Sequence, residues 1–176
     1  YIRLGNTLER NNKFNEAKII YKKAIDIKNN IPGLYYNLGN VYQKLDNLDE
    51  AINSYKIAIN LNSKYIEAYN NLGNVYQKMG QLKEAVNNFK IVISLNSTFP
   101  EAFNNLGNAQ RELGHLNDSE KNLKKAINLR PNYFKAYNNL GNIYRKRGYN
   151  RKALENYIIT LIINPNYKRA YHNLAG

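Results

Sequence analysis

The pair Leu-Gly returns every 34 residues along this chain, and this interval constrains the fold more than any other feature. The pairs are Leu4-Gly5, Leu38-Gly39, Leu72-Gly73, Leu106-Gly107 and Leu140-Gly141, with Leu174-Ala175 at the next interval. Such a period is typical of proteins that stack one small unit many times. It divides one continuous array, 1–176, into a first repeat with a truncated start, full repeats, and the beginning of a sixth: 1–31, 32–65, 66–99, 100–133, 134–167 and 168–176.

Each repeat reads as two short amphipathic helices. When the recurring glycine is numbered position 8, positions 4, 7, 8 and 11 share one face of a first helix, and positions 20, 24, 27 and 28 share one face of a second. Position 4 is always aromatic. Positions 8 and 20 are small, so two helices can approach closely, and the large residues at positions 4 and 24 are expected to fill the space between them. Repeat four departs most from this pattern, with Gln110, Ser119 and Leu123.

A tight turn is predicted between the two helices of each repeat. Position 15 carries Asn12, Asp46, Gly80, Gly114 and Gly148. Asn, Asp and Gly are the residues that most readily adopt the left-handed conformation with which helices end. Each repeat is therefore predicted to be helix, tight turn, helix.

The pattern resembles the tetratricopeptide repeat family over the whole chain. The resemblance rests on the aromatic-x2-Leu-Gly-x2-Tyr opening, as in Tyr69 to Tyr76, and on the later Ala-x3-aromatic, as in Ala51 to Tyr55. It implies an all-α fold, a right-handed superhelix of helix-turn-helix repeats, in which the first helices line a concave groove. Proteins of this family bind other polypeptides.

Asparagine recurs on the face of the first helices that the core does not use. An amide side chain offers donors and an acceptor to the backbone of an extended peptide. The arrangement resembles the asparagine-lined superhelix of the O-linked N-acetylglucosamine transferases. A structural role, bridging neighbouring repeats, is the alternative. The predicted groove asparagines are Asn6, Asn37, Asn40, Asn70, Asn71, Asn74, Asn104, Asn105, Asn108, Asn138, Asn139 and Asn142.

Other groove positions add a charge gradient. The positively charged residues, Lys135 among them, lie toward the C-terminal end of the predicted groove. An arginine can pair bidentately with a carboxylate. We therefore expect an acidic ligand segment at that end, with a solvated, screened rim as the alternative. The remaining predicted groove residues are Tyr36, Gln43, Gln77, Arg111, Arg145, Lys146 and Arg169.

Charge and composition narrow the classes of function. The net charge of +13 sits mainly in residues 1–31 (+4) and 134–167 (+5), so a continuous basic stripe for nucleic acid is not predicted. The chain has no cysteine and no apolar run long enough to cross a membrane. No phosphate loop, metal-binding cluster or nucleophile triad can be assembled from it. We therefore expect no catalysis, cofactor or metal. We also expect no membrane insertion, and the absence of cysteine favours a cytoplasmic location.

The predicted function is a protein interaction scaffold that binds an extended polypeptide. The alternatives are a substrate-recruiting arm of a larger enzyme, such as a glycosyltransferase, a self-assembling scaffold, and RNA binding. The chain begins at Tyr1, so we expect it to be part of a longer protein. An open C-terminal face, with Ile158 and Ile162 in normally polar positions nearby, predicts some end-to-end association of the fragment.

Overall fold

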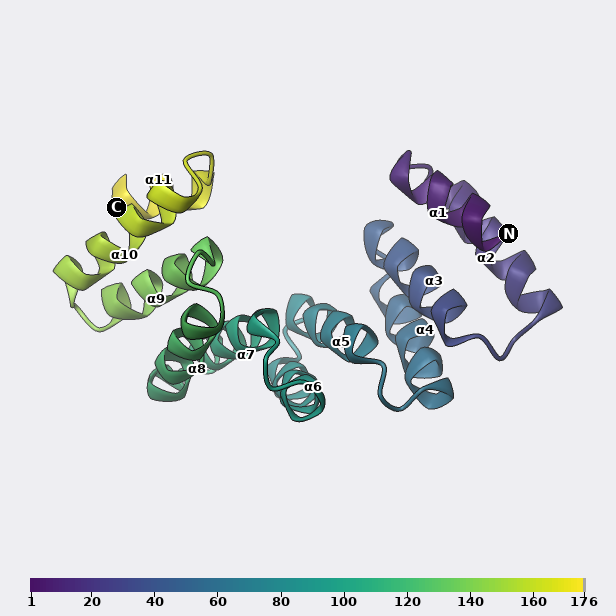
Figure 1. Cartoon of the computed structure of the whole chain (residues 1–176), viewed down its shortest axis with the longest axis horizontal. Coiled ribbons are helices and arrows are strands. Elements are labelled where there is room, and N and C mark those ends of the chain that lie inside the picture. The colour runs from purple at the N-terminus through teal and green to yellow at the C-terminus, as the bar shows by residue number, and fades with distance from the viewer. Residues whose placement is uncertain (176) are drawn as a thin grey trace. The chain divides into compact units, whose positions relative to one another are not determined.

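A computed structural model describes residues 1–175, and within that range it contains helices and no strands (Figure 1). The predicted all-α fold of helical hairpins is confirmed. The chain falls into two compact units, divided between residues 95 and 96, and each is described separately. None of the described helices is both long enough and apolar enough to cross a membrane.

The N-terminal unit contains three hairpins, in which α1 packs against α2, α3 against α4 and α5 against α6. The second helix of one hairpin packs against the first helix of the next, α2 against α3 and α4 against α5, so the unit is a stack. Its helices are α1 Ile2–Arg10, α2 Phe14–Ile27, α3 Pro32–Lys44, α4 Leu48–Leu61, α5 Ile66–Lys78 and α6 Leu82–Leu95.

The C-terminal unit contains two further hairpins and one additional helix, packed in the same manner. Its helices begin at the predicted interval of 34 residues from those before them. They are α7 Pro100–Glu112, α8 Leu116–Leu129, α9 Phe134–Lys146, α10 Asn150–Ile163 and α11 Lys168–Ala175.

The core of each hairpin is a glycine of the first helix against a large side chain of the second. A Cβ atom added at Gly39 would lie 2.6 Å from Cε1 of Tyr55, well inside van der Waals contact. Tyr55 and its counterparts Tyr21, Phe89 and Leu123 are fully buried. The small residues predicted at position 8 are therefore required, because any larger side chain would push the two helices apart.

The turns within the hairpins confirm the prediction for position 15. Asn12 has a φ angle of 57° and Asp46 has one of 63°, both in the left-handed region, and the glycines at this position are also left-handed. These residues end the first helix and reverse the chain within three residues. This short reversal places the two helices of each hairpin side by side.

The aromatic residues at position 4 are less buried than the sequence pattern predicted. Phe103 is buried, whereas Tyr35, Tyr69 and Tyr137 are half-buried, and Tyr171 is 53% exposed. The expectation that position 4 fills the hairpin interior was wrong for these tyrosines. Their hydroxyl groups need polar surroundings, and that of Tyr171 donates to the carbonyl oxygen of Pro165 at 3.0 Å.

Repeat four compensates for its departures from the pattern with hydrogen bonds. The Oε1 atom of Gln110 accepts a bond from Nδ2 of Asn122 at 2.7 Å. The hydroxyl of Ser119 donates to the carbonyl oxygen of Gly107 at 2.5 Å. The polar atoms that replace apolar groups are thus satisfied inside the hairpin, and the helices keep their normal packing.

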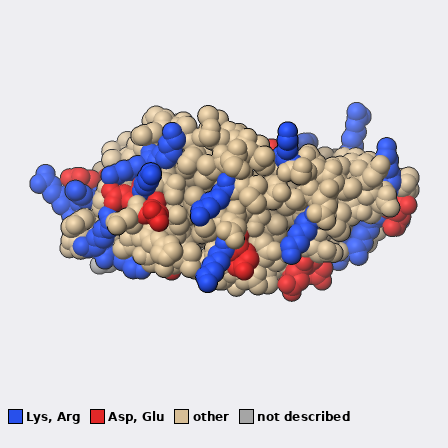
Figure 2. Space-filling view, turned by 90° about the horizontal axis from the view of Figure 1, so that it is seen from below, with Lys and Arg blue, Asp and Glu red and all other residues tan. Residues whose placement is uncertain are grey.

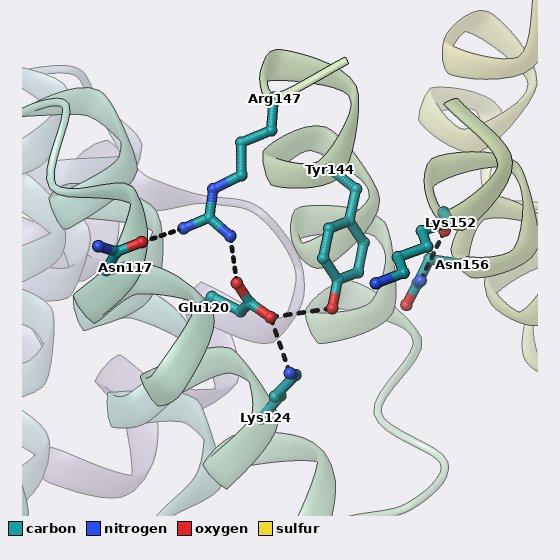
Figure 3. Close-up of polar contacts among 7 residues, drawn as sticks. All are labelled: Asn117, Glu120, Lys124, Tyr144, Arg147, Lys152 and Asn156. Atoms are coloured by element: carbon teal, nitrogen blue, oxygen red, sulfur yellow. Dashed lines mark hydrogen bonds and ion pairs between the residues drawn. The ribbon is translucent and has the colours of Figure 1, made fainter. Parts of the chain in front are cut away.

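A cluster of charged and polar side chains fastens α8 to α9 (Figure 3). Glu120 on α8 forms an ion pair with Arg147, accepts a hydrogen bond from the Tyr144 hydroxyl at 3.0 Å, and pairs with Lys124 at 2.7 Å. Arg147 also donates to the Asn117 side chain at 2.5 Å. Burial would raise the pKa of Glu120, but the bonds from Lys124, Arg147 and Tyr144 lower it to about 2.

The second helix of repeat five carries the expected exposed apolar positions. Ile158 is 45% exposed and Ile162 is 74% exposed, and Leu154 precedes them on the same stripe of α10. The predicted end-to-end association through this end of the chain remains a prediction.

Candidate functional site

A cavity of about 740 Å³ opens on the first helices of the C-terminal unit. Its walls come from α7, α9 and α11, which follow one another at the repeat interval, and from Tyr167 just before α11. Because the core uses only one side of each first helix, the opposite side is available to line this cavity. The lining residues are Asn104, Asn105, Asn108, Arg111, Glu112, Lys135, Asn138, Asn139, Asn142, Tyr167, Arg169, His172 and Asn173.

Most of the lining groups are amides and cations. Arg111, Lys135 and Arg169 bring three positive charges, and Glu112 brings one negative charge. Glu112 lies 3.5 Å from Nη2 of Arg111, which also donates to Oδ1 of Asn108 at 2.9 Å. The Nε atom of Arg111 is shielded from solvent and has no hydrogen-bond partner among the described residues. With three cations against one carboxylate, the cavity offers a ligand positive charge and side-chain donors.

The asparagines in this cavity also bond to one another between repeats. Nδ2 of Asn139 donates to Oδ1 of Asn104 at 2.9 Å, and Nδ2 of Asn173 donates to Oδ1 of Asn138 at 3.0 Å. The prediction that Asn104 and Asn138 face solvent was wrong, because they are only 5% and 3% exposed. The side chain of the next repeat covers each of them.

The N-terminal unit uses a different acceptor for the same bridge. Nδ2 of Asn71 donates to Oδ1 of Asn40 at 2.9 Å, and Nδ2 of Asn37 donates to Oδ1 of Asn6 at 3.2 Å. The acceptor here is the position-9 asparagine, whereas it is the position-5 asparagine in the C-terminal unit. The bridging role that the sequence left open is thus present in both units.

Tyr36, which was predicted to line the groove, is part of these contacts. Its hydroxyl accepts a bond from Nδ2 of Asn71 at 3.2 Å, and its ring lies 5.0 Å from that of Tyr65 and 6.0 Å from that of Tyr55. It is half-buried as a result. Its ring therefore packs against neighbouring tyrosines.

The sequence pattern did not predict a second contact of the position-9 asparagines. Their Oδ1 atoms accept bonds from the core tyrosine of the same hairpin, at 2.6 Å from Tyr21 to Asn6, 2.7 Å from Tyr55 to Asn40 and 2.9 Å from Tyr157 to Asn142. Burial raises the pKa of each of these tyrosines. The signal was present in the sequence, since these are the repeats in which position 24 is tyrosine.

The remaining predicted residues lie near the cavity or in the other unit. Arg145 and Lys146 are exposed at the end of α9, and Arg145 lines a smaller cavity of about 300 Å³ beside Tyr157. Gln43 accepts a bond from Tyr55 at 3.1 Å. The predicted residues on α1, α3 and α5 belong to the N-terminal unit and are Asn6, Tyr36, Asn37, Asn40, Gln43, Asn70, Asn71, Asn74 and Gln77.

Four lining residues were not in the predicted set: Glu112, Tyr167, His172 and Asn173. His172 occupies position 5, so aligning it with Asn138 would have placed it in the groove. Tyr167 precedes α11, and no pattern in the repeats marks that position. Among the described residues, no group of three or more His, Cys, Asp or Glu side chains could hold a metal ion.

Charge outside the cavity is dispersed. On the face drawn in Figure 2, lysine and arginine side chains are scattered among uncharged surface, and several lie beside carboxylates. In the C-terminal unit, carboxylates that pair with a cation include Glu101 with Arg130 at 2.5 Å and Glu155 with Arg151 at 3.3 Å.

Comparisons with known proteins agree with this architecture. A family model described as TPR repeat matches residues 5–46, 45–80 and 107–148, and one described as tetratricopeptide repeat matches residues 66–99. Helical hairpins at a fixed interval define a class of repeat proteins. Within that class, this chain belongs to the tetratricopeptide repeat family.

Solved structures show the same fold. A structure of MamA is 23% identical with a TM-score of 0.83, over 96% of this chain and 99% of that chain. PilF of Pseudomonas aeruginosa is 19% identical with a TM-score of 0.86, over 97% of this chain and 78% of that chain. YrrB is described as a TPR protein with an unusual peptide-binding site. It is 26% identical with a TM-score of 0.79, over 100% of this chain and 91% of that chain. No curated protein matches the sequence significantly.

Proposed function

We propose that this chain is a protein interaction scaffold whose C-terminal unit binds an extended polypeptide, with an acidic segment of that ligand beside Arg111, Lys135 and Arg169. The observation that supports this proposal most directly is the cavity of about 740 Å³, which is lined by amides and cations. An apolar helix needs an apolar groove, whereas an extended backbone needs donors and acceptors. Carboxylates of the ligand match the excess positive charge.

The position of the cations supports an acidic ligand segment. Lys135 and Arg169 are exposed, and no carboxylate pairs with either of them among the described residues. Glu112 is the one carboxylate that lines the cavity, and it lies against Arg111. An incoming carboxylate therefore meets two cations that no other acid neutralises.

The known peptide site of a relative supports a peptide ligand in general terms. YrrB, at 26% identity over the whole of this chain, is described as having a peptide-binding site. Scaffolds of this family are typically non-catalytic, and we extend that role to this chain. The asparagine-lined style of the O-linked N-acetylglucosamine transferases remains an alternative, in which the groove is the substrate-recruiting arm of a larger enzyme.

RNA binding is less well supported. It needs aromatic rings free for base stacking along a basic groove. The rings of Tyr21, Tyr55 and Tyr157 are buried in hairpins, and Tyr36 packs on Tyr65. End-to-end self-assembly through the open C-terminal face, near which Ile158 and Ile162 are exposed, is the other alternative.

The proposal is tested with a fluorescein-labelled decapeptide that alternates aspartate and alanine, here called the acidic probe peptide, in a fluorescence anisotropy titration. The double variant Lys135→Glu/Arg169→Glu is expected to bind it at least about tenfold more weakly, since each lost charge contact contributes on the order of 1 kcal/mol. The matched control is Lys121→Glu/Lys125→Glu, which makes the same charge change on α8 away from the cavity. Equal losses in both variants would mean nonspecific attraction and contradict the proposal.

A further inference from the structure

The two exposed cations of the cavity occupy the same place in consecutive repeats. Lys135 is the second residue of α9 and Arg169 is the second residue of α11, the first helices of repeats five and six. At the matching place, repeats three and four carry Glu67 and Glu101. The charge at this position therefore reverses its sign along the chain, and the two repeats with the positive sign are those whose residues at this position line the cavity.

The first turn of a helix is an unfavourable place for a cation. The unpaired backbone N–H groups make this end of a helix partly positive, so acidic side chains are favoured there. Helices α5 and α7 follow the rule with Glu67 and Glu101, whereas neither α9 nor α11 has an acidic residue in its first turn. Helix stability therefore does not account for Lys135 and Arg169. An anionic ligand does, because it is attracted by both side chains and by the helix ends that carry them.

The excess charge of the cavity matches a doubly negative group. Three cations against one carboxylate leave two positive charges unbalanced. The carboxylate, Glu112, is already engaged, since it lies 3.5 Å from Nη2 of Arg111 and its Oε1 accepts a bond from Nδ2 of Asn108 at 3.0 Å. A single ligand carboxylate would neutralise half of the excess. A phosphate monoester carries a charge of about −1.5 to −2 at neutral pH, so one phosphorylated residue neutralises most of it.

The donors around the cavity also suit a phosphate better than a carboxylate. The Tyr167 hydroxyl and the His172 ring both line the cavity, and neither makes a hydrogen bond among the described residues. The Tyr167 ring is held against that of Phe134, with 4.9 Å between the ring centroids. With Lys135 and Arg169, these side chains supply donors from both sides of the turn into α11. A phosphate presents three strong acceptor oxygens to such a set, whereas a carboxylate presents two.

We propose that the acidic group bound at this end of the groove is the phosphate of a phosphoserine or phosphothreonine in the polypeptide ligand, held by Arg111, Lys135 and Arg169. This inference rests on the proposed function and narrows its acidic segment to one modified residue. Arg111 is fixed by its bond to Asn108 at 2.9 Å and by Glu112, so it forms a preset contact. Lys135 and Arg169 are exposed side chains, which close on the phosphate when it binds.

Three fluorescein-labelled peptides of alanine and glycine, which differ only in a central serine, phosphoserine or glutamate, test the inference by fluorescence anisotropy. The phosphoserine peptide is expected to bind at least about tenfold more tightly than the glutamate peptide, because it brings more charge and one more acceptor oxygen. Equal affinity of these two peptides would overturn the inference and leave the proposed function standing, since that function requires only an acidic segment. If the acidic probe peptide and the phosphoserine peptide both fail to bind, both proposals are overturned.

Charge-neutral variants locate the phosphate. Lys135→Gln/Arg169→Gln is expected to reduce the preference for phosphoserine over glutamate from about tenfold to about twofold or less. The matched control, Lys121→Gln/Lys125→Gln, removes two charges from exposed side chains of α8 outside the cavity and should leave the preference unchanged. All four side chains are exposed, so the fold tolerates both changes, and circular dichroism verifies this. An equal reduction in the two double variants, or none in the first, would overturn the assignment of the phosphate to this cavity.

Competition separates a phosphate carried by a polypeptide from a phosphate alone. Inorganic phosphate and free phosphoserine are added to the complex of the chain with the labelled phosphoserine peptide. Each is expected to displace the peptide only at concentrations at least about tenfold above the dissociation constant of the peptide, because the peptide makes further contacts in the groove. Displacement by either competitor at a concentration equal to that dissociation constant would show a site for the anion alone and would overturn the assignment to a polypeptide.

Discussion

Gly141 on α9 lies directly against Tyr157 on α10, and a Cβ atom at Gly141 would stand 2.5 Å from Cε1 of the tyrosine ring. The ring is 2% exposed and its hydroxyl is bonded to Asn142, so it cannot swing aside without breaking that bond. The same two residues therefore set the spacing of the hairpin and the orientation of a groove amide. If the proposed function holds, stability and peptide binding are therefore linked at this point.

Gly141→Ala is expected to destabilise the protein by about 1–3 kcal/mol, the usual cost of overpacking a tight core. The measurement is the urea midpoint of helix unfolding followed by circular dichroism. Gly33→Ala is the matched control. No atom lies within 4 Å of a Cβ at Gly33 in α3, so this change should leave the midpoint unchanged or raise it, because alanine favours helix. A larger loss for Gly33→Ala than for Gly141→Ala would contradict the packing argument.

Glu120→Gln is expected to destabilise the contact between α8 and α9 by about 1–3 kcal/mol, because the cations Arg147 and Lys124 lose their charged partner. Glu155→Gln is the control. Glu155 is exposed and pairs with an exposed arginine of its own helix, so its loss should cost less than about 0.5 kcal/mol. Similar losses for the two variants would show that the Glu120 cluster does not fasten the repeats.

The same cluster predicts how stability depends on acid. The folded pKa of Glu120, at about 2, is below its ordinary value of 4.5, so the unfolded chain binds a proton that the folded chain does not. The contribution is complete above the ordinary pKa and is lost as the pH falls through about 2. Unfolding midpoints between about pH 5 and about pH 2 should therefore fall less steeply for Glu120→Gln than for the unmodified protein. Parallel curves for the two proteins would contradict it.

Because of Tyr133, we expect the stability of the fold to fall as the pH rises in the alkaline range. Burial and the carboxylate of Glu101 raise its pKa to about 12. A pKa raised in the folded state gives stability that is present below the ordinary value of 10.0 and lost as the pH rises toward about 12. Tyr133→Phe should therefore lessen the fall in unfolding midpoint between about pH 9 and about pH 12. An unchanged slope would show that Tyr133 ionises without unfolding the chain.

Salt is expected to weaken binding of the acidic probe peptide. Raising potassium chloride from about 50 mM to about 500 mM shortens the screening length and weakens the attraction of Lys135 and Arg169 for carboxylates. A peptide with asparagine in place of aspartate should bind more weakly and respond little to salt. Equal salt dependence of both peptides in anisotropy titrations would contradict the charge argument.

Most of the fold could be predicted from the sequence because the repeat multiplies each signal. Gly39 alone is weak evidence, but the same glycine at four further intervals, each opposite a small residue at position 20, leaves few other structures. The turns were predictable for a related reason, since Asn12 and Asp46 stand where other repeats have glycine. The half-burial of Tyr35 and Tyr137 was not, because period alone does not show how far a tyrosine extends toward solvent.

The candidate site was predictable as a surface but not in its hydrogen bonds. The period placed Asn139 and Asn142 on the open face of α9. The hydrogen bonds that these amides make depend on Asn104 of the preceding repeat and on Tyr157 of the paired helix. Those contacts depend on the distance between helices, which the pattern of residue types does not specify. The burial of Asn104 was missed for the same reason.

The most direct test of the account is a nitrogen-15 NMR titration of the chain with the acidic probe peptide, following the side-chain amides of asparagine. If the groove of the C-terminal unit binds the peptide, the amides of Asn142 and Asn173 should shift in a saturable manner, while those of Asn128 on α8 and Asn156 on α10 stay unchanged. Shifts confined to Asn128 and Asn156, or saturable binding without any change at Asn142 and Asn173, would contradict it.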